Sequence, residues 1–588
     1  MPNHPVLELA RLLRQPDGDG HPFSSSVLAG LDREERFPAE ACAALDRFGL
    51  HGFYVDSRYG GMLVDHSELL QLLRTVARHD LTVAVAHGKT FLGSVPTWIA
   101  GDHDQAARLA AEVQGGAVVS WALTEQGRGS DLLAGDLSAR PDEDTPGQWR
   151  LDGEKWLINN ATRSRLICVL ARTAPEGGPR GFSLFLVDKR RLAPGSYRAL
   201  PKIPTHGIRG ADISGIAFDD ARVDGSSLIG EAGSGLETVV KSLQLTRTMC
   251  AALSLGAADH GLRLAADFAA GRRLFGRDLA DLPRVRRILG EAMATVLAAE
   301  AVSVVAARAV HTLTGEMGVV SAVAKAFVPT VVQEMLEQLA ELMGVRSFLS
   351  EIHEDGAFAK LERDHRIVAI FDGSTPVNRS RLIEHFRILA RAYEGGRGDR
   401  DAVTATVSLA DGVPPFDPER LRVISGRGCS IVQTLPDAVA AVRQRGGPGS
   451  APGLTALAGA LLEAVDEVHR AMAAHPPAPR DVPQSAFDLA ERYELCFAGA
   501  AALHLWLSGY TGPGPVPGHP AESPPRAEPA WVEGVLALVL RHLGWPLDGL
   551  AEDVGGAFDR LADLLMNSPG YAPPSLLSVK APLADEAG

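Results

Sequence analysis

The first candidate for chemistry is an acid that ends an apolar run. In IVAIFDGSTPVNRSR, residues 367–381, the hydrophobic segment stops at Asp372, and Gly373, Ser374 and Thr375 follow. Burial disfavours a charged carboxylate, so an acid in this place needs a reason. One reason is structural: Asp372 could cap the helix that follows. The other is functional: Asp372 could be a general base in apolar, water-poor surroundings, which make carboxylates more basic.

A glycine-rich segment is the second candidate. ALTEQGRGSD, residues 122–131, follows a strand-like run. Its glycines could let backbone N–H groups face a ligand. Taken alone, the segment is equally well explained as a turn.

Arginine and histidine motifs also allow both a structural and a functional explanation. RRLFG, residues 272–276, sets two arginines beside an aromatic residue. It fits a solvated helix end, or an anion site, because the guanidinium fork grips phosphate. HEDGAFAKLERDH, residues 353–365, lacks the HExxH spacing, so we expect a solvated face and no metal.

Segments of different periodicity must position these residues. Residues 1–116 carry apolar residues at helical spacing, and residues 117–232 contain short β-prone runs separated by Gly, Pro and Asp. Helical spacing returns over 233–394 in segments long enough for an antiparallel bundle. The sequence therefore predicts a mainly α protein with an N-terminal helical domain, a central β domain and a C-terminal helical bundle.

Residues 395–588 differ in composition from the rest. Linker-like stretches at 446–453, 476–483 and 511–530 separate Ala- and Leu-rich segments with helical spacing. We expect an additional, mostly helical domain here.

Length and charge bound the class of protein. A chain of 588 residues is too long for one compact core. A net charge of −14 argues against binding to nucleic acid or anionic membrane. The five cysteines form no CxxC pair, which favours a reducing, cytoplasmic setting. No signal peptide is evident, and apolar runs such as 534–540 are short, so we expect no integral membrane segment.

The order of the motifs is more specific than any one of them. The chain carries in series LDRFGLHGFYVDSRYGG, ALTEQGRGSD, GEKWLINNA, HGIRGADISGIAFDDARV, GEAGSGLETVVKSLQLTR, RRLFG and IVAIFDGST. This series closely resembles the acyl-CoA dehydrogenase family over roughly residues 30–390. The region after residue 395 looks like the C-terminal domain of the very-long-chain members in position and character, but not in motifs.

The resemblance implies FAD-dependent oxidation of the Cα–Cβ bond of an acyl thioester, on CoA or on a carrier protein. Asp372 stands where most members have Glu, and would remove the α proton while the β hydrogen leaves as hydride to flavin N5. Asp is shorter than Glu by about one C–C bond (~1.5 Å), and such misplacement can cost on the order of a hundredfold in rate. The branched-chain members place the base on an earlier helix, which falls at about Thr246 and cannot serve.

The resemblance also assigns binding residues. It places cofactor contacts at Leu123, Thr124, Gly129, Ser130, Trp156, Asn159, Arg272, Phe275, Glu341, Gly344, Ser374 and Thr375, and substrate contacts at Ser130, Arg247 and Gly373. Arg272 and Phe275 match the pair that reaches the FAD of a neighbouring subunit.

Some of these positions depart from the family pattern. The ring-stacking Trp of the family is replaced by Leu157 or shifted to Trp156, and Asn159 replaces a Thr. Near Glu341 and Gly344 only one of three glycines is kept.

The resemblance implies a homodimer or homotetramer, because the cofactor site is shared between subunits. An electron-transfer flavoprotein is the family's usual electron acceptor. The Ala-, Arg-, Gly- and Pro-rich composition suggests a high-GC bacterium and specialised metabolism. Two alternatives stay open: a flavin-dependent monooxygenase or N-hydroxylase on the same fold, and a catalytically inactive partner subunit.

Overall fold

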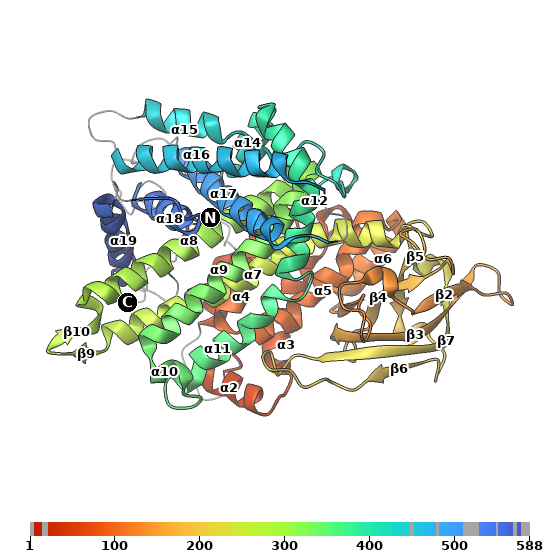
Figure 1. Ribbon diagram of the computed structural model, residues 1–588. Coiled ribbons are helices and arrows are strands. Elements are labelled where there is room, and N and C mark those ends of the chain that lie inside the picture. The colour runs from red at the N-terminus through yellow and green to blue at the C-terminus, as the bar shows by residue number, and fades with distance from the viewer. Residues whose placement is uncertain are drawn as a thin grey trace.

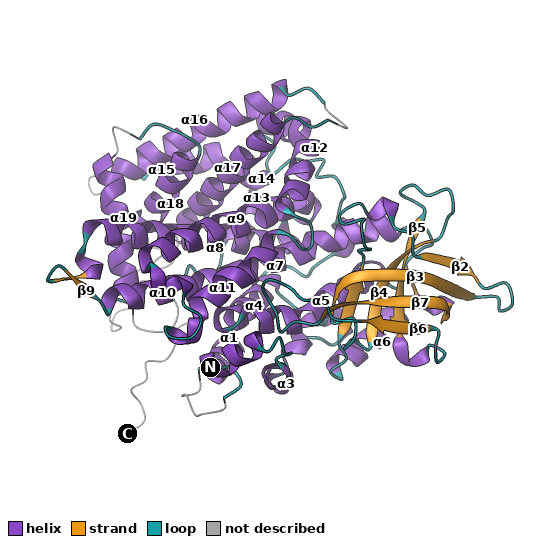
Figure 2. Cartoon of the chain, turned by 60° about the horizontal axis from the view of Figure 1, so that its bottom comes forward, coloured by secondary structure: helices purple, strands orange, loops and turns teal. Residues whose placement is uncertain are grey.

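The computed structural model describes residues 5–14, 21–445, 452–477, 481–509, 529–547, 551–568 and 573–577. Of the stretches expected to be linkers, 446–453 and 511–530 lie mostly outside the described residues, and 476–483 lies partly outside them. Figure 1 shows the path of the chain, and Figure 2 shows a β-sheet projecting from one side of a body of packed helices.

Helices make up the N-terminal part. They are α1 (Pro5–Leu13), α2 (Ser25–Arg33), α3 (Ala39–Phe48), α4 (His66–His79), α5 (Leu81–Ala100) and α6 (His103–Gln114). Three of them begin after an aspartate whose side chain accepts a hydrogen bond from the first turn: Asp65 before α4, Asp80 before α5 and Asp102 before α6. Such caps fix where each helix starts.

A single sheet follows the helices. Its strands are β1 (Val119–Ala122), β2 (Ser138–Pro141), β3 (Gln148–Asn159), β4 (Leu166–Arg172), β5 (Phe182–Asp188), β6 (Tyr197–Leu200), β7 (Ile213–Asp224) and β8 (Leu228–Ile229). Their order is β6-β7-β3-β2-β4-β5-β8, and β1 pairs in parallel with β4. The long antiparallel pair β3–β7 shifts register between Trp156 and Ile158. That shift bears on the site described below.

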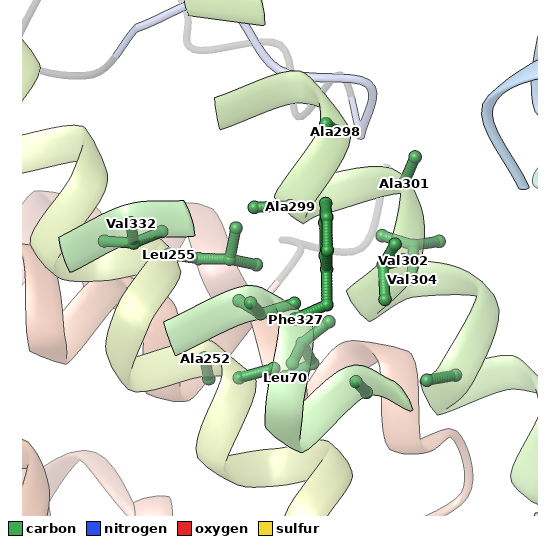
Figure 3. Close-up of a cluster of buried hydrophobic side chains, with 14 of the residues drawn as sticks. Leu70, Ala252, Leu255, Ala298, Ala299, Ala301, Val302, Val304, Phe327 and Val332 are labelled. Atoms are coloured by element: carbon green, nitrogen blue, oxygen red, sulfur yellow. The ribbon is translucent and has the colours of Figure 1, made fainter. Parts of the chain in front are cut away.

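Long helices then form the bundle. They are α7 (Gly235–Ala270), α8 (Pro283–Thr312), α9 (Met317–Met343), α10 (Val345–Phe348), α11 (Ala357–His365) and α12 (Thr375–Glu394), with the hairpin β9 (Arg273–Leu274) and β10 (Arg277–Asp278) after α7. Figure 3 shows the core between α4, α7, α8 and α9, where Leu70, Leu255, Val302 and Phe327 pack together. Small Ala and Val side chains on α8 let these helices approach closely.

Two segments of the bundle, Pro283–Thr312 and Thr314–Met343, are long and apolar enough to span a membrane. By length and composition alone, these two helices pass a test that we expected no segment to pass. In the fold, however, their most apolar windows are 89% and 83% buried. A helix that is apolar all round is also what the core of a large protein requires.

The remaining helices pack onto the bundle. They are α13 (Arg400–Val407), α14 (Ser430–Gln433), α15 (Leu435–Gln444), α16 (Pro452–Ala474), α17 (Gln484–Gly509), α18 (Pro529–His542) and α19 (Ala551–Met566). Helix α17 is tied to α12 by an ion pair of 3.0 Å between Arg379 and the buried Glu494. Helix α19 lies on α8 where Gly290 leaves no room for a side chain beside the Phe558 backbone. The C-terminal helices therefore share one packed body with the bundle.

Candidate active site

Asp372 lies in the turn between the 3₁₀ helix η9 (Arg366–Ala369) and α12, with a φ of +54°. The residue that caps α12 is Ser374, and its side chain makes no cap hydrogen bond. The carboxylate of Asp372 points elsewhere: its Oδ2 lies 3.5 Å from Lys89 Nζ and accepts a hydrogen bond of 3.3 Å from Cys250 Sγ. The structural explanation of Asp372 as a helix cap is therefore wrong.

The surroundings of Asp372 are basic, not apolar as we expected. Its side chain is 14% exposed, and Lys89 on α5 is 15% exposed. The Lys89 ammonium also lies 3.9 Å from the centre of the Phe371 ring, and Lys325 lies 5.6 Å from it. The sequence could not show this, because Lys89 and Lys325 come from helices far from Asp372 along the chain.

The backbone of the turn is held by Arg247 and Lys325. Arg247 Nε donates to the Asp372 carbonyl at 3.1 Å, and Lys325 Nζ donates to the Val368 and Gly373 carbonyls at 2.7 and 3.1 Å. Gly373 has a φ of +95°, and a Cβ there would lie 2.8 Å from Arg247 Nη2, so glycine is required.

Burial lowers the pKa of both cations that hold the turn. Burial, with the charge of Arg381, lowers the pKa of Arg247 to about 10. Burial likewise lowers the pKa of Lys325 to about 8, although the nearby Asp372 opposes the shift.

A second group of residues that we predicted lies on the sheet. Thr124 and Trp156 bridge the loop after β1 to β3: Thr124 Oγ1 donates to the Trp156 carbonyl at 2.7 Å, and the Trp156 N–H donates to the Thr124 carbonyl at 2.9 Å. Leu157, in the register shift of β3, has a φ of +57° and is 43% exposed. Both amide atoms of Asn159 are buried without a hydrogen-bond partner. Buried groups of this kind usually have a hydrogen-bond partner, and the Asn159 amide has none among the described residues.

The glycine-rich loop rests on a buried ion pair that we did not predict. Lys155 Nζ lies 2.7 Å from Glu125 Oε1 and donates to the Leu123 carbonyl at 3.0 Å. The Glu125 carboxylate also accepts from the Asp136 and Leu137 N–H groups, which close the loop. Gly129 and Ser130 are exposed at its tip.

Helix α5 brings the sheet next to Asp372. Lys89 contacts Asp372, while the next residue, Thr90, accepts a hydrogen bond of 3.4 Å from the Val119 N–H at the start of β1. One turn earlier, the Ala86 carbonyl accepts from the Asn160 side chain at 2.7 Å. The residues on β1 and β3 and the Asp372 turn therefore border the same helix.

A third group lies at the far end of α7. Arg272 and Arg346 line a cavity of about 420 Å³ and both lie over the Phe268 ring. Phe275, at the tip of the β9–β10 hairpin, is 94% exposed. Glu341 and Gly344 are exposed at the end of α9. Arg346 lies in the motif of Glu341 and Gly344, but only the fold shows that it joins Arg272.

The Asp372 turn and the residues at the far end of α7 cannot meet within one chain. Arg247 and Arg272 are separated by most of α7, about 35 Å at 1.5 Å per residue. Cys250 could have been found from the sequence, because it lies three residues after Arg247 on the same helix face. Lys89 and Lys325 carry no such signal.

Comparisons with known proteins agree with this architecture. Three family models match in order: acyl-CoA dehydrogenase, N-terminal domain, at residues 25–116; the middle domain at 120–221; and the C-terminal domain at 233–386. A probable acyl-CoA dehydrogenase of Mycobacterium leprae is 29% identical over 355 residues, which cover 60% of this chain and 88% of that protein.

Two solved structures show how far the fold extends. An acyl-CoA dehydrogenase from Bacillus anthracis, complexed with FAD, superposes with a TM-score of 0.67 at 17% identity, covering 96% of this chain and 94% of its own. A prolyl acyl carrier protein oxidase superposes with a TM-score of 0.57 at 20% identity, covering 65% of this chain and 97% of its own. The chain has the helix–sheet–helix fold of these flavin-linked oxidoreductases. It belongs to the acyl-CoA dehydrogenase family.

Proposed function

We propose that the protein is an FAD-dependent dehydrogenase that introduces an α,β double bond into an acyl thioester, with Asp372 as the base for the α proton. The observation that carries the proposal is the Asp372 turn: a carboxylate with little exposure is oriented by Lys89 and Cys250, and its backbone is fixed by Arg247 and Lys325. A helix cap would need none of these contacts.

The turn supplies the parts that proton abstraction requires. The α C–H of a thioester is a very weak acid, so the negative charge that develops on the thioester oxygen needs hydrogen-bond donors. Among the described residues the Asp372 N–H has no hydrogen-bond acceptor, which leaves it free for that oxygen. The Asp372 carboxylate would take the α proton, with Lys89 and Cys250 orienting the side chain and Arg247 bonding the backbone carbonyl of the same residue.

Residues on the sheet fit the isoalloxazine half of FAD. Leu123, Thr124, Trp156 and Asn159 lie in the β1–β3 region, with Gly129 and Ser130 at the loop tip. Ser374 and Thr375, half-buried beside Gly373, would contact the adenine half. Bound there, FAD would accept the β hydrogen as hydride.

A second copy of the chain would complete the cofactor site. Arg272 and Phe275 are about 35 Å from the Asp372 turn along α7, so they would serve the FAD of a neighbouring subunit. The exposed apolar side chains Phe275, Val345, Phe348 and Ile352 gather around this end of the bundle and support an interface there. We propose at least a homodimer, with Glu341 and Gly344 at its contact.

Arg272→Ala is expected to weaken FAD binding by about 10- to 100-fold, because a charge-assisted hydrogen bond contributes about 1.5–3 kcal/mol. Titration of the apoprotein with FAD, followed by flavin fluorescence, measures the Kd. Arg273→Ala is the control, since Arg273 points to Asp278 and does not line the cavity. Equal affinity in the two variants would remove Arg272 from the cofactor site.

The reaction can be separated from its alternatives by the mass of the product. A dehydrogenase converts the acyl thioester to a product lighter by two hydrogens, with an artificial electron acceptor and without oxygen. A monooxygenase would need oxygen and a flavin reductase and would add an oxygen atom. An inactive subunit would give neither product. Only the first outcome supports the proposal.

We also propose a carrier-bound substrate, an electron acceptor and a cellular setting. The likeness to a prolyl acyl carrier protein oxidase supports testing carrier-bound chains beside acyl-CoA, in keeping with specialised metabolism. An electron-transfer flavoprotein is proposed as the acceptor. All five cysteines are free thiols, which supports a reducing, cytoplasmic setting.

A further inference from the structure

A cavity of about 620 Å³ lies where the C-terminal helices meet the bundle. Its lining comes from α12 and from Glu316, the residue just before α9, on one side. The other side consists of the segments before α13 and α14 and the first residue of α14. Figure 1 shows α12 and α14 side by side at this junction.

Three arginines line this cavity: Arg391 on α12, Arg397 before α13 and Arg427 before α14. Within the described part of the chain, none of the three guanidinium groups forms an ion pair or a hydrogen bond with another side chain. In a protein of net charge −14, three unpaired arginines around one cavity concentrate positive charge.

The two acids of the cavity are already engaged. Both oxygens of the buried Glu316 accept hydrogen bonds from Ser430, from Oγ at 2.6 Å and from the N–H at 2.7 Å. Burial raises the pKa of Glu316, although Arg427 opposes the shift. The Asp399 carboxylate caps α13 through the Ala402 N–H. Among the described residues neither acid forms an ion pair with the three guanidinium groups, which leaves these groups to an outside anion.

Residues 422–427, the segment before α14 that reaches the cavity, also contact α7, the helix that carries Arg247. The Arg422 carbonyl accepts a hydrogen bond of 2.7 Å from Gln244, one turn before Arg247 on α7. Three residues later the Ser425 N–H donates to His385 on α12 at 3.1 Å, and Arg427 follows. One short stretch of chain thus runs from beside the catalytic turn to the arginines.

The distance from the cavity to the Asp372 turn can be calculated along two helices. Lys325, which bonds the Gly373 carbonyl, follows Glu316 of the cavity by nine residues, or about 13 Å along the helix. Arg391 of the cavity follows Thr375 by sixteen residues, or about 24 Å. A long flexible arm with its thioester at Asp372 could place a phosphate in this range.

We propose that the Arg391–Arg397–Arg427 cavity binds the phosphate of the phosphopantetheine arm that carries the acyl thioester. The arm is common to CoA and to carrier proteins, and arginine forks bind phosphate in bidentate fashion. The inference rests on the proposed function. It also gives the C-terminal helices a role in substrate binding, because the region after the bundle supplies Arg397 and Arg427.

The test compares thioesters with and without phosphate. In the wild-type holoenzyme, kcat/KM for an acyl-CoA should exceed that for the same acyl chain on pantetheine, which has no phosphate. In the double variant Arg391→Gln/Arg427→Gln this ratio should fall at least tenfold. Arg387→Gln, on the exposed side of α12 outside the cavity, should leave the ratio unchanged. A ratio that the double variant does not change overturns the proposal.

A binding measurement keeps the test independent of turnover. Calorimetry with inorganic pyrophosphate should show binding to the wild-type protein and at least a tenfold weaker Kd in the double variant. Unchanged binding would overturn the site even if turnover is normal. If no thioester reduces the flavin, the proposed function fails, and the calorimetry alone decides the anion site. The same acyl chain is also measured on a carrier protein, and its kcat/KM is divided by that of the pantetheine thioester. Comparison with the ratio for acyl-CoA shows which carrier supplies the phosphate.

Discussion

Asp372→Asn is expected to abolish reduction of the flavin by an acyl thioester, with a loss of about 10²–10⁴-fold or more, as for removal of a general base. The amide keeps the shape of the side chain but cannot take the α proton. FAD should stay bound, because the backbone of the turn is held by Arg247 and Lys325 and not by the carboxylate. Stopped-flow measurement of flavin absorbance gives the rate, and the flavin-to-protein ratio gives the occupancy.

Asp372→Glu separates the effect of losing the carboxylate from the effect of displacing it. It restores the length that most family members have, but in a turn whose neighbours, Lys89 and Cys250, are fitted to aspartate. We expect its rate to fall between those of the wild type and Asp372→Asn, since a displacement of about 1 Å costs on the order of a hundredfold. Equal inactivity of Asp372→Glu and Asp372→Asn would show that the turn does not accept the longer carboxylate. An undiminished rate in Asp372→Asn would exclude the carboxylate as the base.

The second large effect is on stability and concerns Arg74 on α4, which is 1% exposed. Arg74 bonds Asp259 on α7 through two contacts of 2.8 Å and Glu300 on α8 at 2.7 Å. Glu300 in turn accepts from the Leu576 N–H at 3.0 Å and from Ser575 near the C-terminus. Arg74→Met would leave a buried carboxylate without its cation, which costs about 3–5 kcal/mol.

The denaturation midpoint in urea measures this effect. Arg36→Met is the control, because Arg36 pairs with Glu34 on the surface, and such pairs contribute little. We expect the midpoint of Arg74→Met to fall clearly and that of Arg36→Met to stay in place. Equal midpoints in the two variants would show that the buried network is not needed for the fold.

The same network predicts a dependence on pH. Burial alone would raise the pKa of Asp259, but Arg74 and Arg78 reverse this and lower it. A carboxylate whose pKa is lowered by folding stabilises the protein above its unfolded pKa, and this contribution is lost as the pH falls through the folded pKa. The difference in midpoint between wild type and Arg74→Met should therefore shrink in acid.

The helices and strands were predictable because the sequence patterns that specify them are local. Asp65, Asp80 and Asp102 cap helices directly, and the alternation of apolar residues in the 117–232 region follows from the two faces of a sheet. The family resemblance assigned Arg247 to the substrate and Asp372 to catalysis, but it did not predict the hydrogen bond between them, which joins residues 125 positions apart.

The electrostatics of the site could not be predicted. Lys89 and Lys325 sit inside helices whose pattern is otherwise apolar, and nothing in their spacing shows that both face Asp372. The Glu125–Lys155 pair under the glycine-rich loop is hidden in the same way, because it depends on how the loop folds back on β3. Long-range contacts of this kind are set by packing and not by local pattern.

The most direct test of the central claim is anaerobic titration of the FAD-loaded protein with a panel of acyl thioesters, on CoA and on a carrier protein. The proposed enzyme predicts that at least one thioester bleaches the flavin absorbance stoichiometrically and is recovered as its α,β-unsaturated product, and that Asp372→Asn shows no bleaching with the same thioester. A fully loaded flavin that no thioester reduces, or one that Asp372→Asn reduces as well as the wild type, would contradict the account.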